Sequence, residues 1–213
     1  MPVVRRLLLA AAATVVAVGG GIVVLDGDVT PPEGPASAST PLTSFDTSQV
    51  TILRTGFCDR VAEEAVRAAL DAEPEDTRDY GNGDRVRLAS GVRDRAHEHG
   101  CSWTAAGTTA RAWVFAPPVT RATARDLLRR ARATDDCERV PEAPAYGDPS
   151  AGLVCTTGRS QEVSFRGLFG DAWLACSLVS DNVSAGQGAD AAVDRAGRWC
   201  VAVARAAEAQ DTS

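Results

Sequence analysis

The sequence predicts an α+β domain: an antiparallel sheet of about five strands with helices packed on it. Apolar periodicity indicates elements in the order helix, two strands, helix, three strands, helix. Six cysteines, an even number, lie among these elements and predict a domain stapled by disulfides. A long apolar run before them predicts one N-terminal transmembrane helix ahead of the domain.

The apolar run spans Leu7–Leu25, and its one polar residue is Thr14. As a helix it would be roughly 28 Å long, close to the hydrocarbon thickness of a bilayer. Arg5 and Arg6 precede it, and acidic residues follow it, so the expected orientation is N-in and C-out. The run is therefore expected to be a single-pass signal anchor in the cell membrane, with the domain extracytoplasmic. One alternative is a cleaved signal peptide with its apolar core at Leu7–Val18, which would make the protein secreted; another is a buried helix of a cytosolic domain.

Four segments are expected along the chain. Residues 1–29 form the anchor or signal segment, and residues 30–50, rich in Pro, Ser and Thr, form a linker. Residues 51–209 form the extracytoplasmic domain, and residues 210–213 are a tail.

The first helix is expected over residues 55–72, before Pro74. Its buried face is predicted from residues that recur at helical spacing: Cys58, Val61, Ala62, Ala65, Val66 and Ala69.

A hairpin is expected next. Cys101, Trp103 and Ala105 alternate with polar neighbours, and Gly107 marks the turn. The return strand, residues 109–116, ends where two prolines begin.

Thr120 is the expected cap of the second helix. Its apolar face is predicted from Ala124, Leu127, Leu128 and Ala131, and residues 135–150 are expected to form a loop.

Three strands at residues 152–157, 162–169 and 172–180 should form an antiparallel meander, because glycines supply tight turns between them. The last helix is expected over residues 189–208. Its core face is predicted from Val193, Ala196, Cys200, Val203, Ala204 and Ala207.

Six cysteines allow fifteen sets of pairs. The order of elements favours Cys137 with Cys155, which flank one loop, and Cys176 with Cys200, a strand and the helix after it. That choice leaves the remaining two cysteines, Cys58 and Cys101, as the third pair.

A cysteine opening the first helix and the later Cys101-Ser102-Trp103 together resemble a group of actinobacterial exported domains of unknown function, many of them lipoproteins. The chain is also similar to the extracellular sensor domains of mycobacterial receptor Ser/Thr kinases. This second resemblance implies a disulfide between Cys137 and Cys155. It also implies a non-enzymatic domain with a groove between sheet and helices.

Two histidines near a cysteine are the candidate metal ligands. If His97, His99 and Cys101 lie on one strand, they share a face and offer three ligands for zinc or copper. The alternative is that the histidines are solvent-exposed and that Cys101 is oxidised, which removes the thiolate.

Composition narrows the function classes. The net charge of -6 gives no global field that would attract nucleic acid, so no nucleic-acid partner is expected. A basic face on the second helix is a candidate contact for anionic lipids or wall polymers, with a merely solvated face as the alternative; its arginines are Arg121, Arg125, Arg129, Arg130 and Arg132.

Motifs for a nucleophile are absent from the sequence, and no cofactor is expected. The interpretation is a membrane-anchored binding, sensing or envelope module, held by Leu7–Leu25, whose partner is an unknown envelope protein or small ligand. The alternatives are a metal-binding domain using His97 and His99, or a small secreted hydrolase.

Overall fold

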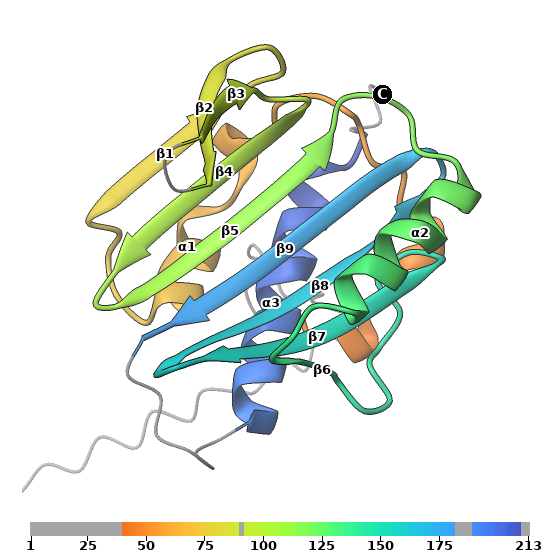
Figure 1. Ribbon diagram of the computed structural model, residues 1–213. Helices are drawn as coiled ribbons and strands as arrows, with labels where there is room; N and C mark the ends of the chain where they lie inside the picture. The colour runs from red at the N-terminus through yellow and green to blue at the C-terminus, as the bar shows by residue number, and fades with distance from the viewer. Residues whose placement is uncertain (1–39, 90–91, 182–188, 210–213) are drawn as a thin grey trace, which may run out of the picture. The chain divides into compact units, whose positions relative to one another are not determined.

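A computed structural model describes residues 40–89, 92–181 and 189–209 (Figure 1). The expected anchor, residues 30–39 of the expected linker and the tail lie outside these residues. Within the described ranges, no helix is both long and apolar enough to span a membrane.

The domain is α+β, and its main sheet is antiparallel with seven strands rather than about five. The strand order is β1-β4-β5-β9-β8-β7-β6, so the last strand in the sequence lies at the centre of the sheet. The strands are β1 (Asp76–Tyr80), β4 (Glu98–Ala105), β5 (Thr108–Phe115), β6 (Cys137–Arg139), β7 (Ser150–Thr157), β8 (Ser160–Phe169) and β9 (Ala172–Ser180).

The two strands missing from the sequence-based prediction are the two edges. No strand was expected at residues 76–80, which form β1, and β6 lies in the segment expected as the loop at residues 135–150. Both are short and charged, and every residue in them is at least partly exposed. An edge strand of this kind has no alternating apolar pattern, and its charges discourage pairing with another chain.

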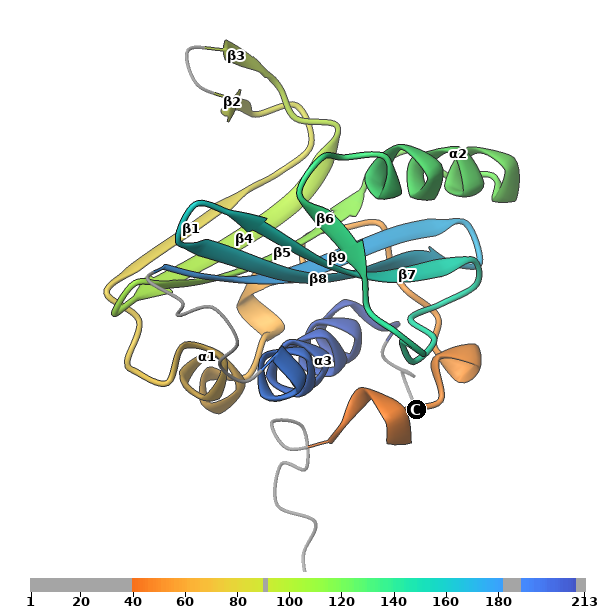
Figure 2. The ribbon, with the colours of Figure 1, turned by 60° about the horizontal axis from the view of Figure 1, so that its bottom comes forward.

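A separate two-stranded hairpin, β2 (Arg85–Ala89) and β3 (Val92–Arg95), was also not expected. It rises over the same side of the sheet as α2 (Arg121–Arg132), whereas α1 (Glu63–Leu70) and α3 (Ala189–Ala207) cover the other side (Figure 2).

The first helix is shorter than the predicted span of residues 55–72. A 3-10 turn, η3 (Cys58–Arg60), comes first, and Val61 is extended, so that α1 begins only at Glu63. The side chain of Phe57 is fully buried, and Cys58 is bonded to Cys101 in β4. These two contacts hold residues 57 and 58 in the core and against β4, and the α-helix begins after them.

Part of the segment expected as linker belongs to the fold. Residues 42–44 and 47–49 form 3-10 turns, η1 (Leu42–Ser44) and η2 (Thr47–Gln49). Leu42 is only 4% exposed and joins the core beside α3. The chain therefore enters the domain on the α3 side of the sheet.

The main core lies between the sheet and the helices α1 and α3. Trp199 on α3 meets Trp103 on β4 edge to face, with ring centroids 5.4 Å apart. A smaller cluster under α2 contains Leu128, Leu168 and Trp173. Both faces of the sheet therefore contribute to the packing, but the α3 side holds most of it.

Three disulfides join the layers and strands, and their pairs match the expected ones. Cys58–Cys101 ties η3 to β4, and Cys137–Cys155 ties the edge strand β6 to β7. Cys176–Cys200 joins the central strand β9 to α3, and both of its residues are fully buried.

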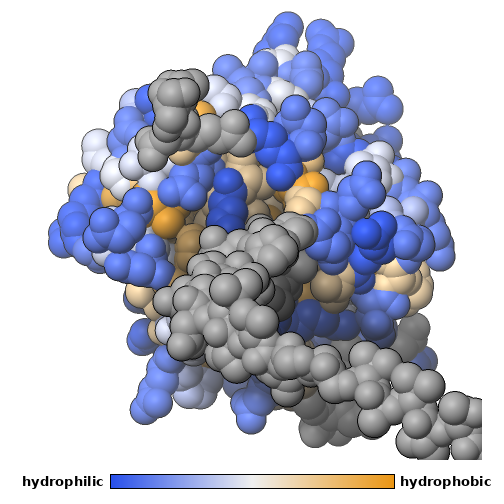
Figure 3. Space-filling view, turned by 180° about the vertical axis from the view of Figure 1, so that it is seen from behind, coloured by the Kyte–Doolittle hydropathy of each residue, from blue (hydrophilic) through white to orange (hydrophobic). Residues whose placement is uncertain are grey.

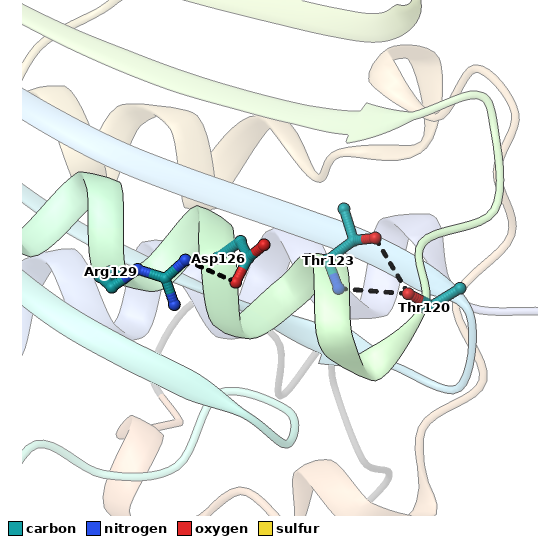
Figure 4. A network of polar contacts seen from close by, with 4 residues as sticks. All are labelled: Thr120, Thr123, Asp126 and Arg129. Atoms are coloured by element: carbon teal, nitrogen blue, oxygen red, sulfur yellow. Dashed lines mark hydrogen bonds and ion pairs between the residues drawn. The ribbon is translucent and has the colours of Figure 1, made fainter.

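The N-terminus of α2 is capped as expected (Figure 4). The backbone N–H of Thr123 donates to Oγ1 of Thr120 at 3.1 Å, and the two hydroxyls lie 2.9 Å apart. One turn further along, Arg129 donates to Asp126 at 2.8 Å. The cap satisfies a backbone donor that would otherwise have no partner in the helix.

Replacing Thr120 with alanine removes this acceptor, and we expect a loss of about 1 kcal/mol in the free energy of unfolding. Urea titration of the oxidised protein measures it. Thr120→Ser keeps the hydroxyl and should retain nearly all of the stability. A serine variant as unstable as the alanine variant would contradict a capping role.

Candidate functional site

A cleft of about 890 Å³ opens between α3 and the β6 side of the sheet. This volume lies in the range of small-molecule binding sites, which is roughly 300 to 1,000 Å³. Strands β7 and β8 form its floor, α3 forms one wall, β6 and the loop after it form the other, and η1 closes one end.

The floor is apolar because of the strand alternation. Val154 and Gly152 on β7 pair with Val163 and Phe165 on β8, so these residues share the face that looks toward α3. Phe165 is 1% exposed, and Val154 is half-buried at the floor of the cleft.

The α3 wall contributes a half-buried apolar residue, Val193, and a glycine, Gly197. A Cβ atom placed on Gly197 would lie only 3.1 Å from Cβ of Leu42. The glycine therefore lets η1 lie close to the helix and close that end of the cleft. Figure 3 shows this side of the molecule, where apolar patches lie among hydrophilic residues.

Carboxylates dominate the charged lining. Four acidic residues and one arginine line the cleft: Asp136, Glu138, Asp190, Asp194 and Arg139. Of the acidic residues, Asp194 forms an ion pair with Arg198 at 2.8 Å. The N-terminus of α3 adds a partial positive charge of roughly half a unit, which is smaller than the excess of carboxylates. The cleft therefore favours a ligand that carries positive charge.

Buried groups with perturbed acidity lie elsewhere in the described structure. Tyr80 donates its hydroxyl to Glu98 at 2.6 Å, and burial together with this bond raises its pKa. Burial also raises the pKa of Tyr146, whose hydroxyl donates to the carbonyl of Cys200. Burial lowers the pKa of Arg166. None of these three side chains lines the cleft. The groups whose pKa is shifted by burial therefore lie outside the candidate site.

The structure separates the candidate metal ligands. His97 lies in a bend before β4, whereas His99 and Cys101 lie on β4 itself. The expectation that all three share one strand face is therefore wrong, because the strand begins at Glu98. Cys101 is bonded to Cys58, so it offers no thiolate. Among the residues with defined positions, no three His, Cys, Asp or Glu side chains group closely enough to hold a metal ion.

The arginines of the second helix lie on α2, on the side of the sheet away from the cleft (Figure 2). All five are exposed, and two of them pair with acidic neighbours: Arg121 with Asp148, and Arg129 with Asp126. This basic helix and the acidic cleft are therefore two separate surfaces.

Sequence reasoning missed the cleft residues because they come from segments far apart in the chain. The signal that could have pointed to them is the acidic pattern around Cys137, where Asp136 and Glu138 flank a cysteine expected in a disulfide. Comparison with known proteins adds nothing to this site: no family model matches the chain, and no curated protein matches it.

Proposed function

We propose that the chain is a membrane-anchored, extracytoplasmic binding module of the cell envelope. In this proposal, the cleft between α3 and the sheet receives a ligand with an apolar body and a cationic group. The observation that carries the proposal is the lining itself, an apolar floor of Val154 and Phe165 under a rim of carboxylates.

Two further observations support the proposal, one on where the domain lies and one on what it does. The apolar run Leu7–Leu25 and the disulfides fit an exported domain held near a membrane. The resemblance to extracellular sensor domains implies a groove between sheet and helices, and the cleft lies between these layers.

The test uses three probes with the same naphthyl group: naphthylethylamine, naphthylethanol and naphthylacetate. The full chain, in nanodiscs of neutral lipid, is titrated with each probe, and the methyl NMR signals of Val154 and Val193 are followed. We expect the amine to shift both signals at the lowest concentration and the carboxylate to shift them least.

Glu138→Gln combined with Asp190→Asn removes two carboxylates of the rim. We expect the preference for the amine over the alcohol to fall about three- to tenfold, the effect of two partly exposed charge contacts. The matched control is Asp76→Asn with Asp79→Asn, on the opposite edge of the sheet. Equal binding of amine and carboxylate, or no shift at either valine, would refute the proposal.

A further inference from the structure

Positive charge is concentrated on the side of the sheet away from the cleft. The hairpin from Asp84 to Arg95 has four arginines and two aspartates, and α2 has five arginines and one aspartate. These two elements thus hold nine of the 22 basic residues of the chain but only three of its 28 acidic ones. Both stand over the same face of the sheet (Figure 2). Two strongly basic elements therefore stand over one face of the sheet (Figure 2) in a protein whose net charge is -6.

The hairpin arginines form a ladder of like charges. Arg85 lies directly opposite Arg95, and Arg87 lies directly opposite Arg93. Because side chains alternate along a strand, all four arginines lie on one face of the ribbon. Neighbouring side chains are then about 5 Å apart across the strands and about 7 Å apart along them. Like charges in opposite positions destabilise a hairpin, so packing within the fold does not explain this arrangement.

The two aspartates of the hairpin bind backbone N–H groups and, among the described residues, form no ion pair with the ladder. The carboxylate of Asp84 accepts from the N–H of Gly81 at 2.8 Å, and that of Asp94 accepts from the N–H of Arg95 at 2.7 Å. Arg85, Arg87 and Arg93 are exposed and form no ion pair within the part of the chain that the structure describes.

We propose that the arginine ladder of the hairpin, with α2 on the same side of the sheet (Figure 2), binds a linear polymer that carries phosphate groups. A guanidinium presents a planar pair of donors that matches two phosphate oxygens. Phosphates repeated along a polymer can occupy successive rungs of the ladder and relieve the repulsion between the arginines. This binding goes beyond the proposed ligand of the cleft and uses a different surface.

A bilayer surface is the competing partner, and the shape of the ladder favours a polymer. The four guanidinium groups follow one narrow ribbon at intervals of about 5 and 7 Å. A linear polymer with phosphates at close intervals can follow such a ribbon, whereas the headgroups of a bilayer lie in a plane.

The test measures binding of fluorescent inorganic polyphosphate to the full chain in nanodiscs of neutral lipid, across a range of salt concentrations. Arg87→Gln with Arg93→Gln removes one rung of the ladder. We expect affinity to fall at least tenfold at low salt, and the slope of log K against log salt to decrease by about 1.4, or about 0.7 for each lost contact. The melting temperature should stay the same or rise, because a repulsive pair is removed.

The control variant, Arg67→Gln with Arg159→Gln, changes the net charge equally but alters arginines on α1 and on the turn between β7 and β8. Its affinity should stay within about twofold of the unmodified chain, a difference of about 0.4 kcal/mol. An equal loss in both variants would overturn the proposal, since net charge alone would then explain binding. Binding of the unmodified chain to phosphatidylglycerol vesicles but not to polyphosphate would also overturn it, in favour of a lipid surface.

Discussion

Replacing both Cys176 and Cys200 with alanine should lower the free energy of unfolding by about 4 to 5 kcal/mol. The bond closes a loop of 24 residues, and loop closure alone accounts for about 3 kcal/mol of this. The remainder reflects packing: both cysteines are 0% exposed, and they join the central strand β9 to α3. Domains of this size are stable by only about 5 to 15 kcal/mol, so this variant should lie close to unfolding.

Urea titration with tryptophan fluorescence measures this loss. The matched control is Cys137→Ala with Cys155→Ala, which opens a bond of sequence separation 18 at the edge of the sheet. Its loop-closure contribution is nearly the same, about 3 kcal/mol, but its cysteines are half-buried. Equal losses in the two variants would show that burial of the Cys176–Cys200 bond adds nothing beyond loop closure.

Trp199→Ala is expected to cost about 3 to 5 kcal/mol of unfolding free energy, the usual range for removing a large buried aromatic side chain. Trp199 is 2% exposed and packs edge to face with Trp103. Its indole Nε1–H also donates to the carbonyl of Arg111 on β5 at 3.1 Å. The side chain therefore joins α3 to two strands of the sheet.

Trp199→Phe separates these contributions, because it keeps an aromatic ring and removes the N–H donor. We expect its loss to be smaller than that of Trp199→Ala, with about 1 kcal/mol due to the missing hydrogen bond. Trp113→Ala is the control: Trp113 is half-buried on the other face of the sheet, and its removal should cost about 1 to 2 kcal/mol. A Trp113 variant as unstable as the Trp199 variant would contradict the assignment of the main core to the α3 side.

The hairpin of β4 and β5 is predicted well because its residues alternate: one face of each strand is buried and the other is partly exposed. The last helix follows from apolar residues at helical spacing, and the strands β7 to β9 follow from the glycine turns between them, although β9 is buried on both faces. The edge strands have no buried face. Asp76–Tyr80 reads as a polar connection, and its pairing with β4 becomes visible only in three dimensions.

The candidate site was less accessible to sequence reasoning than the fold. Its floor, walls and end come from Leu42, β6 to β8, and α3, which are brought together only by the packing of the helix on the sheet. The metal hypothesis failed for two local reasons. The strand β4 begins one residue after His97, and Cys101, the expected third ligand, is in a disulfide. The arginine ladder depends on register: Arg85 and Arg95 are ten positions apart in the sequence and become neighbours only in the hairpin.

The central position of β9 has a consequence for the order in which the sheet forms. The ribosome makes the chain from its N-terminus, so β4 and β5 can pair, and Cys58 can reach Cys101, before the later strands have been made. β5 then presents an open edge until β9 arrives, because Thr108 pairs with Ser180, which comes 72 positions later. Pairing across such long separations is slow to form. A chain stalled before β9 would therefore be left with two unjoined halves of a sheet, vulnerable to proteolysis and to pairing with a neighbouring molecule.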